Sequence, residues 1–299
     1  MAARAKQQTT GRSTVFATED SDPSTKRSLG VRLGHAIQAN ELVLLYQPIV
    51  DLRTRDLVAV EALLRWRQPD GSLLGPDGFI PLAEELNLIG PIGDWVVGEV
   101  CRQCIDWRNQ GFQVDMSFNV PPRQLWQPDA VQKLLGAMRA AGADPKCFIV
   151  EITESTAMRD PDRTERVLQE MHGQGLRLAV DDFGTGYSSL ARLRDLPVDL
   201  LKIDRRFVRD IPHDSDAVSM VNAVLGLARS LDMQPLAEGI ETEEQLGYLV
   251  GRGCRLGQGY LFSPPVPAER IPTFASGGAR ALDDASSKGD GPAGPGPSF

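Results

Sequence analysis

Histidine and cysteine, the usual protein ligands of zinc and softer metals, are scarce in this chain. Its 299 residues include three histidines, His35, His172 and His213, and four cysteines. Cys101 and Cys104 form a C-x-x-C pair, but they lie in the amphipathic helical pattern "WVVGEVCRQCIDW", and no second pair follows at zinc spacing. The scattered histidines argue against a histidine-built metal site, and we interpret the cysteine pair as structural.

Long apolar runs are also missing. No apolar stretch reaches the ~18 residues of a membrane span, and the basic residues near the start are not followed by the apolar segment of a signal peptide. The formal net charge is −8, so the chain lacks the positive surface that non-specific nucleic-acid binding requires. We therefore expect a soluble, cytoplasmic protein that binds neither membranes nor nucleic acid. Any anionic ligand would be held by metal ions or by a few well-placed cations.

Composition changes at both ends of the chain. Residues 1–28 are polar and lack periodicity, and residues 275–299 are rich in glycine and proline, so we predict two disordered tails. Residues 29–274, about 246 in number, remain for a single domain. This length is close to the ~250 residues typical of an eight-fold βα barrel.

Within this domain, short apolar runs alternate with longer amphipathic segments. Strands are predicted at 42–50, 57–64, 114–120, 147–153, 177–182, 199–204, 234–238 and 255–262. Helices are predicted at 78–87, 91–110, 128–141, 162–174, 188–195, 215–231 and 241–252. Only "DLRTRD" separates the first two strands, so they must form a hairpin, whereas the others alternate with helices and imply a parallel sheet. The expected fold is α/β, a modified TIM (β/α)8-type barrel with one antiparallel strand.

Seven predicted strands carry a charged or amide side chain late in an otherwise apolar run. These residues are Glu61, Asn119, Glu151, the adjacent Asp181 and Asp182, Lys202, Glu238 and Gln258. In a parallel barrel the late ends of the strands meet at one mouth, where active sites are built. Buried polar groups are costly unless they are paired, so this repeated placement predicts a functional site.

The predicted mouth gathers five carboxylates around one lysine. Their mutual repulsion would raise the carboxyl pKa values unless divalent cations relieved it. Carboxylate and amide oxygens favour Mg²⁺ or Mn²⁺, with Ca²⁺ as a non-productive occupant, and two such ions can assist an in-line phosphoryl displacement. Arg65, four residues after Glu61, is either a phosphate partner or an exposed surface cation.

Seven motifs in this order resemble those of the EAL family of cyclic di-GMP phosphodiesterases. They are "YQPIVDL" (46–52), "EALLRW" (61–66), "FIPLAEELNLI" (79–89), "DDFGTGYSSL" (181–190), "LLKIDRRFV" (200–208), "AEGIET" (237–242) and "QGYLFSPP" (258–265). The similarity spans roughly residues 32–270, the whole predicted barrel. It implies hydrolysis of cyclic di-GMP to linear 5′-pGpG, and a homodimer formed through a surface next to loop 183–190.

The resemblance also implies a role for each matching position. The primary metal ligands would be Glu61, Asn119, Glu151 and Asp181, with Asp182 serving a second ion and Glu238 a further acid of the metal and water network. Lys202 would orient or deprotonate the attacking water, which makes Lys202, Glu238 and Glu61 the catalytic set. Substrate contacts would come from Gln47, Arg65 and Gln258, and Glu154 would hold loop 183–190 in its active shape.

Two other functions remain open from the residues. The same barrel could be a non-hydrolytic receptor for the dinucleotide, because no regulatory or cyclase-like domain is evident in the chain. Five intact acids count against this, since a pure receptor does not need them. The barrel could instead use Lys202 as a Schiff-base nucleophile, but so many acids would keep that lysine charged and unreactive.

Overall fold

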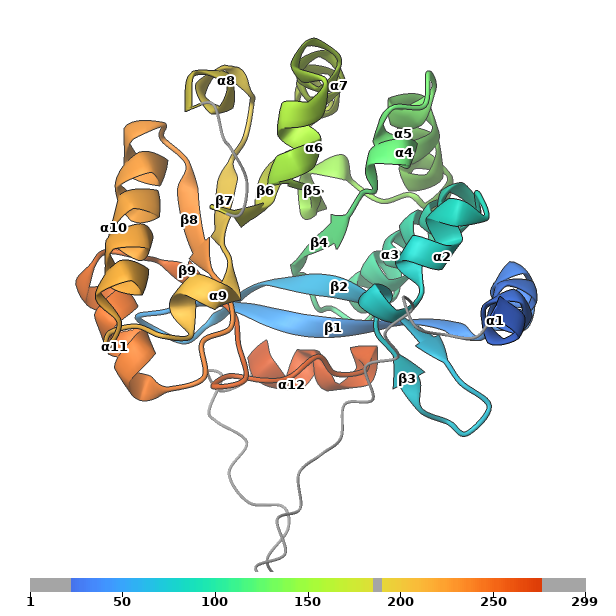
Figure 1. Cartoon of the computed structure of the whole chain (residues 1–299), viewed down its shortest axis with the longest axis horizontal. Coiled ribbons are helices and arrows are strands. Elements are labelled where there is room, and N and C mark those ends of the chain that lie inside the picture. Colours follow the sequence, from blue (N-terminus) through green and yellow to red (C-terminus); the bar gives the residue numbers. More distant parts are fainter. Residues whose placement is uncertain (1–22, 185–189, 276–299) are drawn as a thin grey trace, which may run out of the picture. The chain divides into compact units, whose positions relative to one another are not determined.

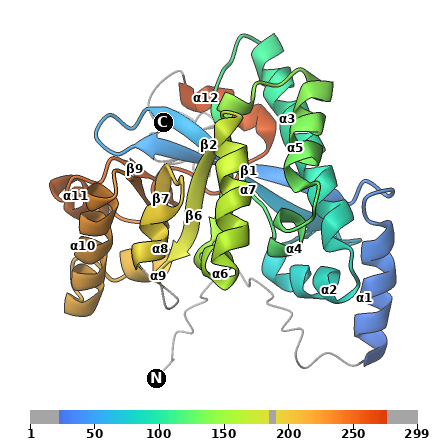
Figure 2. The same ribbon diagram turned by 90° about the horizontal axis from the view of Figure 1, so that it is seen from above.

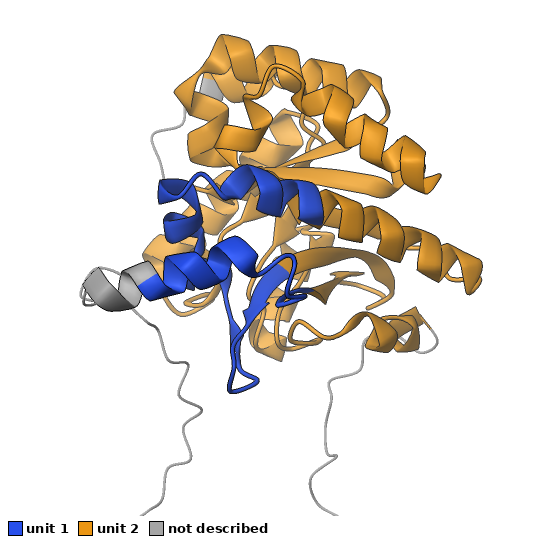
Figure 3. Ribbon diagram, turned by 90° about the vertical axis from the view of Figure 1, so that its right-hand side faces the viewer, with its two compact units in different colours: residues 1–43, 64–95 blue, residues 44–63, 96–299 orange. Residues whose placement is uncertain are grey.

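The structure is a computed structural model that describes residues 23–184 and 190–275. The chain divides into two compact units, residues 1–43 with 64–95 and residues 44–63 with 96–299 (Figure 3). The first is called unit 1 and the second unit 2. None of the described helices is long and apolar enough to cross a bilayer.

The secondary structure alternates strand and helix through most of unit 2 (Figure 1). The strands are β1 Leu42–Asp51, β2 Leu57–Arg67, β3 Leu73–Leu74, β4 Asp115–Asn119, β5 Phe148–Thr153, β6 Arg177–Phe183, β7 Leu200–Ile203, β8 Gln234–Ala237 and β9 Leu256–Gly257. The helices are α1 Pro23–His35, α2 Ile80–Glu85, α3 Ile89–Asn109, α4 Pro122–Leu125, α5 Ala130–Ala141, α6 Glu154–Arg159, α7 Pro161–Gly173, α8 Leu190–Asp195, α9 Arg205–Val208, α10 Ser215–Ser230, α11 Glu243–Gly251 and α12 Pro272–Ala275. Short 3₁₀ turns are η1 Pro76–Gly78, η2 Pro145–Cys147 and η3 Ala268–Arg270.

Within the described residues, eight strands close into a barrel in the order β1-β9-β8-β7-β6-β5-β4-β2, because β1 also pairs with β2. Strands β2 and β4 to β9 pair in parallel, while β1 runs antiparallel to β9. The predicted α/β barrel with one antiparallel strand is therefore confirmed. Strand β3 is an additional strand, paired with the end of β2 at Trp66 and Arg67 in unit 1.

Local sequence explains where several helices begin and end. The Asp214 carboxylate accepts hydrogen bonds from the first backbone N–H groups of α10, and Thr242 with Gln245 forms a capping box at the start of α11. Helix α5 ends at Ala141 and is followed by Gly142, whose left-handed φ of 71° stops the helix. Helices α7 and α10 then cover the strands from outside, α7 against β6 and α10 against β7 and β8 (Figure 2).

Several elements differ from the sequence-based expectation, among them the short helices α4, α6, α9 and α12, which were not predicted. Strand β9 covers only Leu256–Gly257 rather than 255–262, because the chain turns at Gly259 to lie against the Ile240 backbone. Helix α1 begins at Pro23, inside the predicted tail 1–28, and β3 was not predicted at all. The hydrophobic periodicity of the sequence is weak in both α1 and β3, so neither was predicted from it. Residues 1–22 and 276–299 lie outside the described part, so the domain boundaries stay predictions.

Candidate metal centre

The interior of the barrel in unit 2 is built in layers. Its apolar layer takes one residue from each of seven strands, Ile49, Ala59, Ile149, Ala179, Leu200, Leu236 and Leu256. Side chains two positions apart on a strand point to the same face, so the next layer is read two residues further along each parallel strand. That layer contains Glu61, Glu151, Asp181, Lys202, Glu238 and Gln258, and Gln47 occupies the equivalent place two residues before Ile49 on antiparallel β1.

Lys202 is the centre of the polar layer. Its side chain is 1% exposed, and Nζ lies 2.7 Å from Glu151 Oε2, 2.8 Å from Glu238 Oε1 and 3.2 Å from Asp181 Oδ2. Glu61 Oε1 is 3.6 Å away. Burial alone would lower the pKa of Lys202, but these carboxylates outweigh it and raise the pKa well above its ordinary value. The ammonium stays charged, which makes it a poor nucleophile.

Burial and crowding raise the pKa values of two of these carboxyl groups, Glu151 and Glu238. Burial, with the charges of Glu61 and Asp181, raises the pKa of Glu151 well above that of an ordinary glutamate, although Lys202 opposes this. Burial likewise raises the pKa of Glu238 to about 8. Repulsion between these acids is therefore only partly relieved by one lysine, and further positive charge would be favourable at this layer.

Two amide side chains complete the cluster. Asn119 Nδ2 lies 3.3 Å from Glu61 Oε1 and 3.2 Å from Glu151 Oε2, and Gln258 Nε2 donates to Glu61 Oε2 at 2.6 Å. Gln258 Oε1 is buried and has no hydrogen-bond partner among the described residues. A half-turn of the Asn119 amide would exchange its donor for an oxygen ligand, because amide nitrogen and oxygen have nearly the same shape.

Asp181 and Asp182 share the mouth because β6 is irregular there. The register between β6 and β7 shifts between Val180 and Phe183, and Asp182 adopts a left-handed φ of 55°. In a regular strand these neighbours would point to opposite faces. Although Asp182 as a whole is exposed, partial burial of its carboxyl group, with the charges of Asp181 and Asp204, raises its pKa to about 6.

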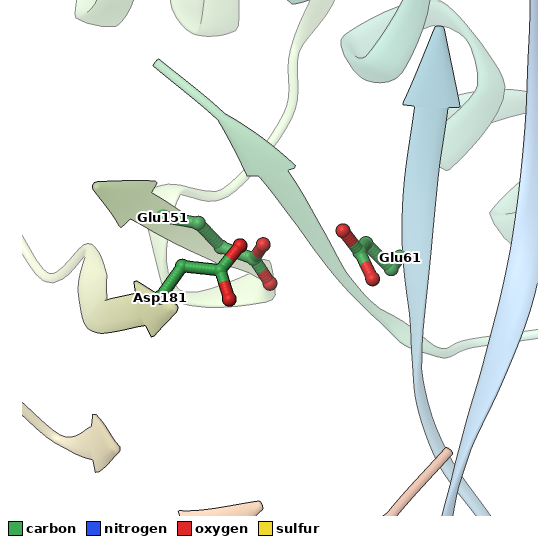
Figure 4. Close-up of side chains that lie close together, drawn as sticks. All are labelled: Glu61, Glu151 and Asp181. Atoms are coloured by element: carbon green, nitrogen blue, oxygen red, sulfur yellow. The ribbon is translucent and has the colours of Figure 1, made fainter. Parts of the chain in front are cut away.

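The carboxylates form two groups that could each hold a cation. Oxygens of Glu61, Glu151 and Asp181 lie within 4.8 Å of one another, and so do those of Asp181, Asp182 and Glu238. Figure 4 shows the first group, contributed by β2, β5 and β6, with the carboxyl groups turned toward a common space. Asp181 belongs to both groups. A donor set made only of oxygens favours Mg²⁺, Mn²⁺ or Ca²⁺ over zinc.

The remaining predicted residues occupy different surroundings. Gln47 is buried, and its Nε2 donates to the Ser263 carbonyl at 3.1 Å. Glu154 is buried at the start of α6, where Oε2 accepts the Gly184 N–H at 2.8 Å. Residues 185–189, most of loop 183–190, lie outside the described residues. Arg65 belongs to unit 1, where its guanidinium donates to the Leu64 carbonyl at 2.8 Å, so its substrate contact stays a prediction.

Two polar residues of the barrel were not singled out from the sequence. Asp204 is buried beside Asp182, accepts the Arg206 N–H at 2.6 Å, and lies two positions after Lys202. Ser117 is 1% exposed, and its hydroxyl has no partner among the described residues. Spacing by two from Lys202 and from Asn119 was the signal that could have identified them.

Comparison with known proteins agrees with this arrangement. Residues 31–265 match the EAL domain. The bifunctional diguanylate cyclase/cyclic di-GMP phosphodiesterase MucR of Pseudomonas aeruginosa is 41% identical over 240 residues, which are 80% of this chain and 35% of MucR. The cyclic di-GMP phosphodiesterase NbdA of the same organism is 39% identical over 244 residues, 81% of this chain and 31% of NbdA. The chain thus spans about a third of the length of these relatives.

A solved structure gives the same picture in three dimensions. The PaMucR phosphodiesterase in complex with c-di-GMP superposes with a TM-score of 0.79 at 41% identity, covering 82% of this chain and 99% of that one. The sequence match, the barrel and the layer of acids at its mouth all agree with the same family assignment. This chain belongs to the EAL domain family.

Proposed function

We propose that this protein is a metal-dependent phosphodiesterase that hydrolyses cyclic di-GMP to linear 5′-pGpG through attack of water on phosphorus, assisted by two Mg²⁺ or Mn²⁺ ions. One observation supports it above the others: two sets of carboxylate oxygens share Asp181, so two cations could lie side by side. The relatives MucR and NbdA are named cyclic di-GMP phosphodiesterases, and PaMucR was solved with c-di-GMP bound.

In this proposal the ions are held by the two carboxylate groups. Glu61, Glu151, Asp181 and Asn119 would hold the first ion, and Asp181, Asp182 and Glu238 the second. When bound, such ions lower the pKa of water and neutralise charge that develops on a phosphate. Ca²⁺ would fit the same oxygens without supporting turnover.

The protein's own groups would divide the remaining work. Lys202 is assigned to orienting the attacking water as a hydrogen-bond donor rather than to deprotonating it, because its raised pKa keeps it charged. Burial raises the pKa of Glu238 to about 8, so this carboxyl group holds a proton at neutral pH until a cation displaces it, and once ionised it is assigned to accepting the proton of the water. Gln47, Gln258 and Arg65 are proposed to contact the dinucleotide, and Glu154 to hold Gly184 and the loop after it.

A non-hydrolytic receptor is the second candidate. It is favoured by the close contacts of Lys202 with the carboxylates, which can neutralise part of the cluster without any cation. A receptor would bind cyclic di-GMP at the same mouth and leave it intact.

The deciding experiment incubates the purified protein with cyclic di-GMP in Mg²⁺, Mn²⁺, Ca²⁺ or a chelator and follows the products by chromatography. We expect pGpG with Mg²⁺ or Mn²⁺ only, and a loss on the order of 10²- to 10³-fold in rate for Glu61→Ala and Asp181→Ala. Glu170→Gln, an exposed change on α7, is the control and should keep full activity. Binding without turnover in every metal would support the receptor, and turnover in the chelator would exclude the proposed metal dependence.

Cellular context follows from the same proposal. A cytoplasmic protein acting on a soluble dinucleotide, and a homodimer formed near loop 183–190, are consistent with it. Light scattering during size-exclusion chromatography would measure the dimer directly.

A further inference from the structure

A cavity of ≈ 360 Å³ lies in unit 2 at the end of the barrel opposite the carboxylates. Its wall includes Val58 at the start of β2, and Val114 and Asp115 at the start of β4. Strands β2 and β4 begin at this end of the barrel, whereas Glu61 and Asn119 lie later on these strands, toward the opposite end. The cavity is therefore separate from the proposed metal centre, and its size is sufficient to admit small molecules.

Two thiols face this cavity from different elements. Cys104 lies on α3, one turn before the buried Trp107, and Cys147 closes the η2 turn directly before β5. Both are reduced and only partly buried. The register pairs Met116 with Phe148, which places Cys147 beside Asp115 at the start of adjacent strands.

The two thiols are also near each other, because both line the same cavity and Cys147 is among the groups that raise the pKa of Cys104. The other cysteines differ: Cys101 and Cys254 are buried and do not line the cavity. We propose that Cys104 and Cys147 form an oxidation site, in which a peroxide entering the cavity converts the pair into an intramolecular disulfide. The bond would join α3 to the start of β5, the strand that carries Glu151.

The reaction balances with the peroxide as oxidant. One thiolate attacks a peroxide oxygen and the O–O bond breaks, which converts that cysteine to a sulfenic acid. The hydroxide that is released takes up a proton and becomes water. The second sulfur then attacks the sulfenic sulfur, the S–S bond forms, and a second water leaves with the remaining proton. Two thiols and one hydrogen peroxide give one disulfide and two waters.

The surroundings set the expected rate. Burial raises the pKa of Cys104 to about 11 and also raises that of Cys147, with Asp115 and Asp144 adding to the second and Arg108 opposing both. Few thiolates exist at neutral pH, so oxidation should take minutes to hours there and speed up in alkaline buffer.

The test oxidises the full chain with hydrogen peroxide in a chelating buffer, blocks free thiols, and maps tryptic peptides without reductant. We expect peptide 103–108 linked to peptide 147–159 with the loss of two hydrogen atoms, reversed by dithiothreitol. Cys104→Ser and Cys147→Ser should each abolish the link, while the matched control Cys254→Ser keeps it. A mixture of nitrogen-15-labelled and unlabelled protein should give no hybrid peptide, because the bond is intramolecular.

A second readout is the melting temperature, which should rise by several degrees on oxidation in the wild type and not in Cys104→Ser. The proposal fails if the link joins Cys101 or Cys254, if hybrid peptides dominate, or if both thiols stay reduced at excess peroxide in alkaline buffer while the protein remains folded.

Discussion

At the scale of single residues, the decisive feature is a lysine buried beneath four carboxylates. A buried charge is costly unless it is paired, and here each partner depends on the same ammonium. The arrangement explains how the barrel tolerates so many acids when no cation is bound. It also suggests that lysine and bound cations play overlapping electrostatic parts.

Replacing Lys202 by methionine should therefore destabilise the protein. Because four acids lose their common partner, we expect the free energy of unfolding to fall by about 3 to 5 kcal/mol. Saturating Mg²⁺ should restore part of this loss, since it supplies positive charge at the same layer. Urea denaturation with and without Mg²⁺ measures both effects, and Lys133→Met on the surface of α5 is the control. Equal losses in the two variants would contradict the assignment.

Metal affinity should depend on pH through two of these carboxyl groups. With pKa values raised to about 8 for Glu238 and about 6 for Asp182, both groups hold protons below pH 6 and have lost most of them above pH 8. A cation must displace those protons, so the apparent affinity for Mg²⁺ should rise between these limits, by at most about tenfold per pH unit for each proton released.

Calorimetry in two buffers of different ionisation enthalpy would count the released protons. Glu238→Gln should release fewer protons at pH 7 than the wild type. Identical proton release in the two proteins would show that Glu238 does not take part in the linkage.

At the scale of elements, the barrel strands place a polar side chain two residues beyond an apolar one. This spacing could be predicted from the sequence, because the alternation of side chains along a strand is a local property. The irregular ends of strands β6 and β9 could not be predicted in this way. The left-handed turn at Asp182 and the early end of β9 depend on neighbours distant in the chain, such as the Ile240 backbone against Gly259.

This close approach predicts a sensitive position at Gly259. A Cβ there would lie 2.1 Å from the Ile240 carbonyl oxygen, so Gly259→Ala must displace backbone next to Gln258. We expect a loss of about 1 to 3 kcal/mol in stability, together with weaker metal binding. The matched change Gly226→Ala, inside α10 with nothing within 4 Å, should instead stabilise by about 0.5 to 1 kcal/mol. Thermal denaturation of the two variants separates a steric effect from a general effect of alanine.

At the scale of the whole molecule, the sequence was enough to predict the α/β barrel and the residues of its polar layer. It was not enough to show that Lys202 contacts four acids at once, because that contact is a property of the closed ring and not of any one strand. Helix α1 and strand β3 escaped prediction, since short or weakly periodic segments take their structure from packing. Arg65 could be named from the sequence as a candidate substrate contact, but the sequence did not show what its side chain binds.

Cation binding should stabilise the folded chain as a unit. At a Mg²⁺ concentration 100 times the dissociation constant, the gain is about 2.7 kcal/mol if the unfolded chain does not bind. The melting temperature should therefore rise with Mg²⁺ or Mn²⁺ and return when a chelator is added. Asp181→Asn, which changes the one residue common to both carboxylate groups, should remove most of this rise. An unchanged rise would place the cation elsewhere.

The left-handed backbone of Asp182 restricts which amino acids can occupy that position. Glycine and asparagine accept such a conformation readily but bring no negative charge, and β-branched residues resist it. Aspartate alone combines conformational tolerance with a short anionic side chain. A saturation library at this one codon would consequently separate the effect on folding from the effect on function. The variants that fold most easily would be those that lack the negatively charged side chain.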